Sequence, residues 1–291
     1  EPTGYDVHFG GGSKVYNVID VRQSYLQKVV VQGLKALGYG QEASRSIHFS
    51  YEMVALSPRS LSEIKVDLSE EDKERSFLEV SGRKGLGVKA DDLIDRLEEK
   101  ALAEVDKRNP DLQPAAKKLI AAQIAAAAVR YFMLKYARNS LIIFDFDEAL
   151  NFEGETGPYL QYTAVRLRSI FHKFEERTGV IGQELLRTIA NNQFSLAELS
   201  PEEARDFWQL VVYGSALDEE VLRAIATLEF SGLAKFTFNL CQKINGYYHR
   251  YPVLAEKNHE LRTFRLKTIF FAHEILNQAL GLLGIQVPDK M

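Results

Sequence analysis

Cysteine is almost absent from this 291-residue chain, because Cys241 is the only one. No disulfide can therefore form within the chain, and we expect a reducing, cytoplasmic compartment. Long apolar runs are also missing, so neither a membrane span nor a membrane partner is expected. The opening Glu-Pro-Thr-Gly-Tyr-Asp has neither the basic start nor the apolar core of a signal peptide. It does not begin with Met, which favours a processed chain or a part of a longer one.

An excess of positive charge is missing as well. The net charge is −4, so any case for nucleic-acid binding must come from a local cluster of cations. The apolar fraction of 46% is ample for hydrophobic cores. The length favours two domains, which we place at residues 1–150 and 151–291.

The first of these domains begins with a β-α-β pattern. Residues 14–20 and 48–56 are short, apolar and β-branched, which predicts two strands. Residues 21–37 between them have a helical pattern that ends at a pair of glycines. This order predicts parallel strands, although two are too few for a whole nucleotide-binding sheet. The polar residues 59–76 read as a loop or a short hairpin.

Residues 77–88 form a glycine-rich stretch with two adjacent cations, Arg83 and Lys84. A mobile, basic loop suits a lid over a triphosphate, because its cations can stabilise the departing pyrophosphate. The alternative is an ordinary exposed basic turn.

Two helices and a pair of aspartates follow. Residues 90–107 predict an acidic amphipathic helix, and the alanine-rich residues 114–137 predict a helix that packs closely. Asp145 and Asp147 could suggest a metal, but no third ligand stands at a suitable spacing. We therefore predict a capped turn and no metal site.

The second predicted domain begins with a strong helix start. Thr156 suits the N-cap, and Pro158 then falls in the first turn. Apolar residues continue on one stripe of the helix, and Tyr162, Arg166 and Lys173 lie on a neighbouring stripe. Further helical segments at 180–192, 201–213, 218–229, 232–251 and 254–283 predict a bundle of five or six helices. The alternative is that this first helix is an ordinary capped helix, whose polar stripe has no function.

Residues 235–267 are locally basic and rich in aromatic side chains. Only Glu256 and Glu260 oppose the cations there, which are Lys235, Lys243, Arg250, Lys257, Arg262, Arg265 and Lys267. Cations for phosphates and rings for unstacked bases suit an RNA loop. The alternative is that the rings form a core and the lysines only solubilise it.

The amino-acid sequences of several stretches resemble those of arginyl-tRNA synthetases, which are class I aminoacyl-tRNA synthetases. Residues 153–162, Glu-Gly-Glu-Thr-Gly-Pro-Tyr-Leu-Gln-Tyr, are similar to the family's entry into its helical anticodon-binding domain. Residues 18–23, residues 238–254 and the closing residues 282–291 are also similar to sequences of this family. At the place of the family's Asp-Ala-Leu-Arg signature this chain reads Arg-Thr-Phe-Arg, so only Arg265 matches. No His-x-Gly-His motif is present.

The resemblance implies a mostly α fold: the end of a class I Rossmann-type α/β catalytic domain, followed by an all-helical anticodon-binding bundle. Gln23 would help to hold the arginine substrate, with capping of the next helix as the alternative. Residues 81–84 resemble a divergent Lys-Met-Ser-Lys-Ser loop, although Glu79 and Gly82 replace its two lysines. The implied ATP-binding residues are Ser81, Gly82, Arg83 and Lys84, with Arg83 and Lys84 catalytic. The implied tRNA-binding residues are Tyr162, Arg166, Lys173, Lys243, Tyr247, Arg250 and Arg265.

The implied activity is ATP-dependent attachment of arginine to tRNA(Arg). The partners would be tRNA(Arg), L-arginine and ATP with Mg²⁺, without DNA and without a bound cofactor. Because the His-x-Gly-His motif is absent, we expect these 291 residues alone not to form arginyl-adenylate. The alternatives are a non-catalytic tRNA-binding protein and a purely structural helical interaction domain.

Overall fold

The computed structural model describes residues 11–79 and 88–291. Two compact units emerge, the first from Glu1–Val54 with Arg138–Ile142 and the second from Ala55–Ala137 with Ile143–Met291. This division differs from the predicted boundary after residue 150, because the helices on both sides of that boundary pack into one unit. The division into contact units does not test the predicted domains 1–150 and 151–291, which stay a prediction.

The first unit contains the predicted β-α-β pattern. Strand β1 (Val15–Asp20) leads through a short 3-10 turn, η1 (Val21–Gln23), into helix α1 (Ser24–Ala36). Helix α2 (Gly40–Arg45) then precedes strand β2 (Ser46–Tyr51). The two strands are parallel, from the pair Val15 and Ser46 to the pair Asp20 and Tyr51, as the sequence pattern predicted.

The predicted strand 48–56 is in fact two strands. After β2 ends at Tyr51, the Glu52 N–H donates to the carbonyl of Arg138 at 2.7 Å. A separate strand, β3 (Val54–Leu56), then pairs with β4 (Ile142–Phe144) in a second two-stranded sheet. The apolar run is continuous in sequence, but its hydrogen-bond partners change along it.

The prediction of a loop or hairpin at 59–76 is wrong, because the segment forms two short helices. Helix α3 (Pro58–Glu63) is capped by Ser57, whose hydroxyl accepts from the Ser60 N–H at 3.1 Å. Helix α4 (Glu70–Lys73) is capped in the same way by Ser69. Ser-Pro and Ser followed by three acids are helix-start signals, which the polar composition concealed.

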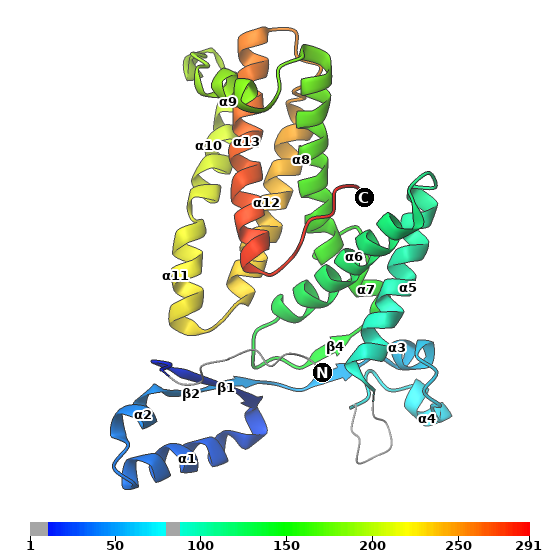
Figure 1. Cartoon of the computed structure of the whole chain (residues 1–291), viewed down its shortest axis with the longest axis vertical. Helices are drawn as coiled ribbons and strands as arrows, with labels where there is room; N and C mark the ends of the chain where they lie inside the picture. Colours follow the sequence, from blue (N-terminus) through cyan, green and yellow to red (C-terminus); the bar gives the residue numbers. More distant parts are fainter. Residues whose placement is uncertain (1–10, 80–87) are drawn as a thin grey trace, which may run out of the picture. The chain divides into compact units, whose positions relative to one another are not determined.

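Two long helices follow in the second unit, as predicted. Helices α5 (Ala90–Arg108) and α6 (Pro114–Leu134) pack side by side (Figure 1). Their contact is built from small and branched side chains, among them Ala101, Ala121 and Ile124. The short helix α7 (Phe146–Ala149) comes directly after β4.

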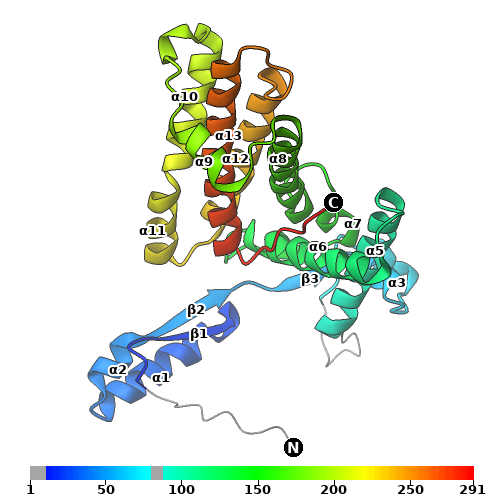
Figure 2. The same cartoon turned by 45° about the horizontal axis from the view of Figure 1, so that its top comes forward.

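The rest of the second unit is a helical bundle, and the prediction of five or six helices is confirmed. Helices α8, α10, α12 and α13 run side by side, and α6 packs against the beginning of α8 (Figures 1 and 2). The helices are α8 (Gly157–Thr178), α9 (Gly182–Ala190), α10 (Pro201–Ser215), α11 (Leu217–Thr227), α12 (Ser231–Arg250) and α13 (His259–Leu282).

One buried polar side chain ties the bundle to α6 and to the closing segment of the chain. Gln161 on α8 has no exposed surface. Its amide nitrogen donates to the carbonyl of Gln123 on α6 at 3.0 Å and to the carbonyl of Gln286 at 2.6 Å. Both acceptors are main-chain atoms, so this one amide joins three segments far apart in sequence.

Candidate nucleic-acid interface

The entry into α8 has the cap and the close packing that its sequence predicts. The Thr156 hydroxyl accepts from the Tyr159 N–H at 3.3 Å, and Pro158 stands in the first turn. Gly157 lies against the backbone of α6, so close that a Cβ there would be 2.2 Å from the carbonyl oxygen of Ala127. This contact fixes where α8 begins and therefore where its side chains point.

The predicted polar stripe of α8 faces outward. Tyr162 is 40% exposed, and Lys173 is exposed without an ion pair to any described residue. Arg166, which lies between these two positions in the sequence, is half-buried. We call Tyr162, Arg166 and Lys173 the α8 surface. On the apolar stripe, Leu160 and Ala164 are fully buried, as the periodicity predicted.

The arginine of the α8 surface is held by a ring on α12. The Arg166 guanidinium lies 4.9 Å from the ring centroid of Tyr248. Nearby, the Asn245 amide donates to the Tyr159 hydroxyl at 3.1 Å and to the Thr163 hydroxyl at 3.0 Å, which fixes α8 against α12. A cation on a ring face is oriented without losing its charge, so it can still contact a phosphate.

The two predicted cations of α12 each contact α10. Lys243 lies 5.1 Å from the ring centroid of Tyr213. The Arg250 side chain is 56% exposed and pairs with Asp206 at 2.6 Å. We call Lys243 and Arg250 the α12 surface.

Two of the seven predicted tRNA-binding residues are buried, and their prediction as surface contacts is corrected. Tyr247 is 1% exposed, and its hydroxyl donates to Glu203 at 3.4 Å. Burial and the charge of Glu203 raise the pKa of Tyr247. Its ring has no free face on which a base could stack.

Arg265 is 8% exposed and is held by two carboxylates. It makes a bidentate pair with Glu203, at 2.7 and 2.8 Å, and a further pair with Glu256 at 2.9 Å. Burial disfavours its charge, but the bond and charge of Glu203 outweigh this and raise the pKa of Arg265. The matching arginine of the signature therefore joins α10 to α13 and does not face solvent.

Tyr248 is a functional candidate that the sequence reasoning missed. The helical period contained the signal, because Leu240, Ile244 and Tyr247 lie on one stripe and are buried together. Tyr248 falls beside that stripe and is only partly buried. The period therefore separates the core tyrosine from the surface one.

In the first unit, Gln23 lies just beyond the carboxyl end of β1 and is exposed. It occupies the N-cap position of α1, but its side chain makes no capping bond. The alternative of a helix-capping side chain is therefore not supported. The carboxyl end of a parallel strand is where open α/β sheets bind ligands.

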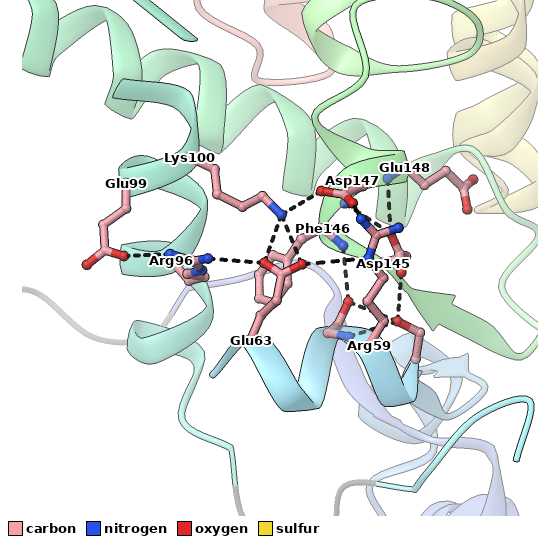
Figure 3. Close-up of polar contacts among 11 residues, drawn as sticks. Arg59, Glu63, Arg96, Glu99, Lys100, Asp145, Phe146, Asp147 and Glu148 are labelled. Carbon is pink, nitrogen blue, oxygen red and sulfur yellow. Dashed lines mark hydrogen bonds and ion pairs between the residues drawn. The ribbon is translucent and has the colours of Figure 1, made fainter. Parts of the chain in front are cut away.

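The predicted ATP loop, Ser81, Gly82, Arg83 and Lys84, lies outside the described residues. The paired aspartates are described, and the predicted capped turn is confirmed. Asp145 caps α7 by accepting from the Asp147 and Glu148 N–H groups at 2.9 and 3.1 Å (Figure 3).

The carboxylate of Asp147 forms ion pairs with two basic side chains. Lys100 lies 2.5 Å from it, and Arg59 also pairs with it (Figure 3). Lys100 further joins Glu63 at 2.8 Å, so these charges link α3, α5 and α7. Within residues 11–79 and 88–291, no cluster of three His, Cys, Asp or Glu side chains could hold a metal ion. Over the same residues, no helix is both long and apolar enough to cross a membrane.

Known proteins are similar to this chain both in its helical bundle and over nearly its whole length. The family model "DALR anticodon binding domain" matches residues 160–291. The arginine–tRNA ligase of Pyrococcus furiosus is 32% identical over 287 residues, which are 97% of this chain and 41% of that protein. The Thermus thermophilus ligase is 32% identical over 282 residues, 94% of this chain and 41% of that protein.

Solved structures give the same result. The T. thermophilus arginyl-tRNA synthetase covers 96% of this chain with a TM-score of 0.72 and 29% identity. The Plasmodium falciparum arginyl-tRNA synthetase, at 20% identity and a TM-score of 0.65, shows likeness of fold. This chain spans 41% of each of these structures. The predicted fold class, mostly α with the end of an α/β domain before a helical bundle, is confirmed.

Proposed function

We propose that this chain acts in ATP-dependent attachment of arginine to tRNA(Arg). The proposal proceeds from its family, because the chain belongs to the arginyl-tRNA synthetases and matches their C-terminal part. Its helical bundle would grip the anticodon arm of the tRNA. The observation that carries this proposal is the α8 surface, where Arg166 lies on the ring of Tyr248 beside the exposed Tyr162.

The chemistry of RNA explains this choice of side chains. Lys173, Arg166 and the cations of the α12 surface would contact phosphates, which supply most of the affinity and make it depend on salt. Tyr162 and the exposed part of Tyr248 would stack on bases of the anticodon loop, whose bases are not paired. A chain with a net charge of −4 can thus bind RNA through the local α8 and α12 surfaces.

The catalytic contribution is proposed for the first unit and the loop. Gln23, exposed beyond the end of β1, would contact the arginine substrate. Arg83 and Lys84, with Ser81 and Gly82, would contact ATP and stabilise the departing pyrophosphate. ATP would bring Mg²⁺ with it as part of the substrate complex. The reaction would take place in the cytoplasm.

The test of the RNA surface is equilibrium binding of tRNA(Arg) to the 291-residue chain at several salt concentrations. Lys173→Ala should reduce the slope of log affinity against log salt by about 0.7 to 0.9, because one phosphate contact is lost. Tyr162→Ala should cost roughly 1–3 kcal/mol with little change in that slope, because a stacked ring is lost.

Lys267 supplies the matched control. It is exposed on α13, a helix that carries none of the proposed contacts, and Lys267→Ala makes the same charge change. Its effect on the salt slope should be small. Equal effects of Lys173→Ala and Lys267→Ala would mean that the α8 surface is not the RNA site.

The test of the loop uses an enzyme that contains this chain together with the His-x-Gly-His segment. Replacing Arg83 and Lys84 by Ala should slow arginine-dependent ATP–pyrophosphate exchange strongly and leave tRNA affinity nearly intact. An unchanged exchange rate would leave the two residues as an ordinary basic turn.

A further inference from the structure

Two of the carboxylates on helix α10 lie one turn apart and are almost fully buried: Glu203 is 4% exposed and Asp206 is 8% exposed. Each accepts a hydrogen bond from one tyrosine hydroxyl of the 247–251 stretch and pairs with one arginine. Glu203 receives Tyr247 and Arg265, whereas Asp206 receives Tyr251, at 2.8 Å, and Arg250, at 2.6 Å. The two carboxylates therefore have the same kinds of partner.

The two arginines differ in how firmly they are held. The Arg265 side chain is 10% exposed and binds Glu203 through two nitrogens. The Arg250 side chain is 56% exposed and reaches Asp206 through one nitrogen. Its Nε donates to the carbonyl of Gly246 at 3.3 Å. Only Arg250 can therefore leave its carboxylate for a ligand without being drawn out of a core.

We propose that Asp206 is a specificity-determining residue that competes with RNA phosphates for Arg250. This inference rests on the proposed function, in which Arg250 contacts tRNA. A carboxylate and a phosphate accept from the same guanidinium donors, so a phosphate that takes the nitrogen now held by Asp206 must displace that carboxylate. When Arg250 moves, the Tyr251 hydroxyl stays on Asp206, and the carboxylate is not left without a partner.

The competition acts most strongly against RNA that has no other hold on the chain. A tRNA bound to the α8 surface presents its next phosphate at a high effective concentration, and it can displace Asp206. An RNA that meets Arg250 alone must separate the ion pair without that help. Asp206 thus weakens non-specific binding more than binding of the proper tRNA.

The test is Asp206→Asn in the 291-residue chain, with tRNA(Arg) and an unstructured polyuridine RNA as probes. Asn keeps the shape and can still accept from Tyr251. Polyuridine binding should tighten by about two- to fivefold, the range expected for an ion pair whose arginine is exposed, and tRNA(Arg) binding should tighten less. Circular dichroism at the assay temperature checks that the Asp206→Asn variant is folded.

Glu220 supplies the matched control. It pairs with the exposed Arg223 at 2.7 Å on α11, and Glu220→Gln removes the same charge from a similar pair. Its effect on polyuridine affinity measures the general change in charge. In an Arg250→Gln background, Asp206→Asn should give no gain beyond that of Glu220→Gln.

Three results would overturn the inference: an unchanged polyuridine affinity, a weakened one, or a gain that persists without Arg250. A weakened affinity would mean that Asp206 orients Arg250 for phosphate. Failure of the proposed function looks different, because the unsubstituted chain would then show no salt-dependent affinity for tRNA(Arg).

Discussion

Replacing Gly157 with alanine should separate α8 from α6. The added Cβ would lie 2.2 Å from the carbonyl oxygen and 2.5 Å from the carbonyl carbon of Ala127. These are backbone atoms, so no change of side-chain rotamer can relieve the overlap. The backbone of Gly157 is itself helical, so the whole penalty comes from this one contact.

The magnitude follows from the cost of overpacking, typically 1–3 kcal/mol where side chains can adjust. Because two helix backbones must move here, we expect the free energy of unfolding to fall by about 3 kcal/mol or more. For a unit of this size that loss corresponds to a melting temperature lower by about 6–12 °C. Urea unfolding followed by far-ultraviolet circular dichroism measures it.

Gly281 on α13 is the matched control. A Cβ there meets nothing within 4 Å, and the residue is exposed inside a helix. Gly281→Ala adds the same methyl group and should stabilise the protein by up to about 1 kcal/mol. Equal stability of the Gly157→Ala and Gly281→Ala variants would refute the close approach of α8 to α6. Gly157→Ala should also weaken tRNA binding, since α8 carries Tyr162 and Arg166.

Three further predictions concern the interior of the bundle. Arg265→Met should lower the free energy of unfolding by about 3–5 kcal/mol in urea, because it leaves a buried carboxylate without its cation. Tyr247→Ala should cost roughly 3–5 kcal/mol of stability and leave the tRNA affinity of the folded chain unchanged, whereas Tyr248→Ala should weaken binding at nearly full stability. Burial lowers the pKa of His273, so the unfolded chain binds its proton more readily. Stability should therefore fall as the pH drops through about 6.5, and His273→Gln should reduce that fall in urea titrations at several pH values.

Local signals predicted the elements that depend on neighbouring residues. The Thr-Gly-Pro stretch at 156–158 carries its own cap and first turn, so α8 begins where the sequence indicates. The alanines of α6 predicted close packing, and its buried face contains Ala121, Ala125 and Ala128. The order of strand, helix and strand predicted the parallel pair β1 and β2.

One missed feature depends on residues far apart in sequence, and two others had local signals. Arg265 and Glu203 are 62 positions apart, and nothing local shows that their charges cancel inside the bundle. A basic count over residues 235–267 therefore included an arginine that faces inward. Tyr247 and Tyr248 are adjacent and chemically identical, and only the helical period separates them. Composition misled at 59–76, where serine caps begin two short helices.

The amide of Gln161 suggests how this part of the family can change over evolution. Its two partners are the main-chain carbonyls of Gln123 and Gln286, which every residue type provides. Positions 123 and 286 are thus free to vary as long as the chain keeps its path, while position 161 is constrained. We expect little correlated substitution among the three positions. A covariation search would overlook a contact on which α6, α8 and the closing segment all depend.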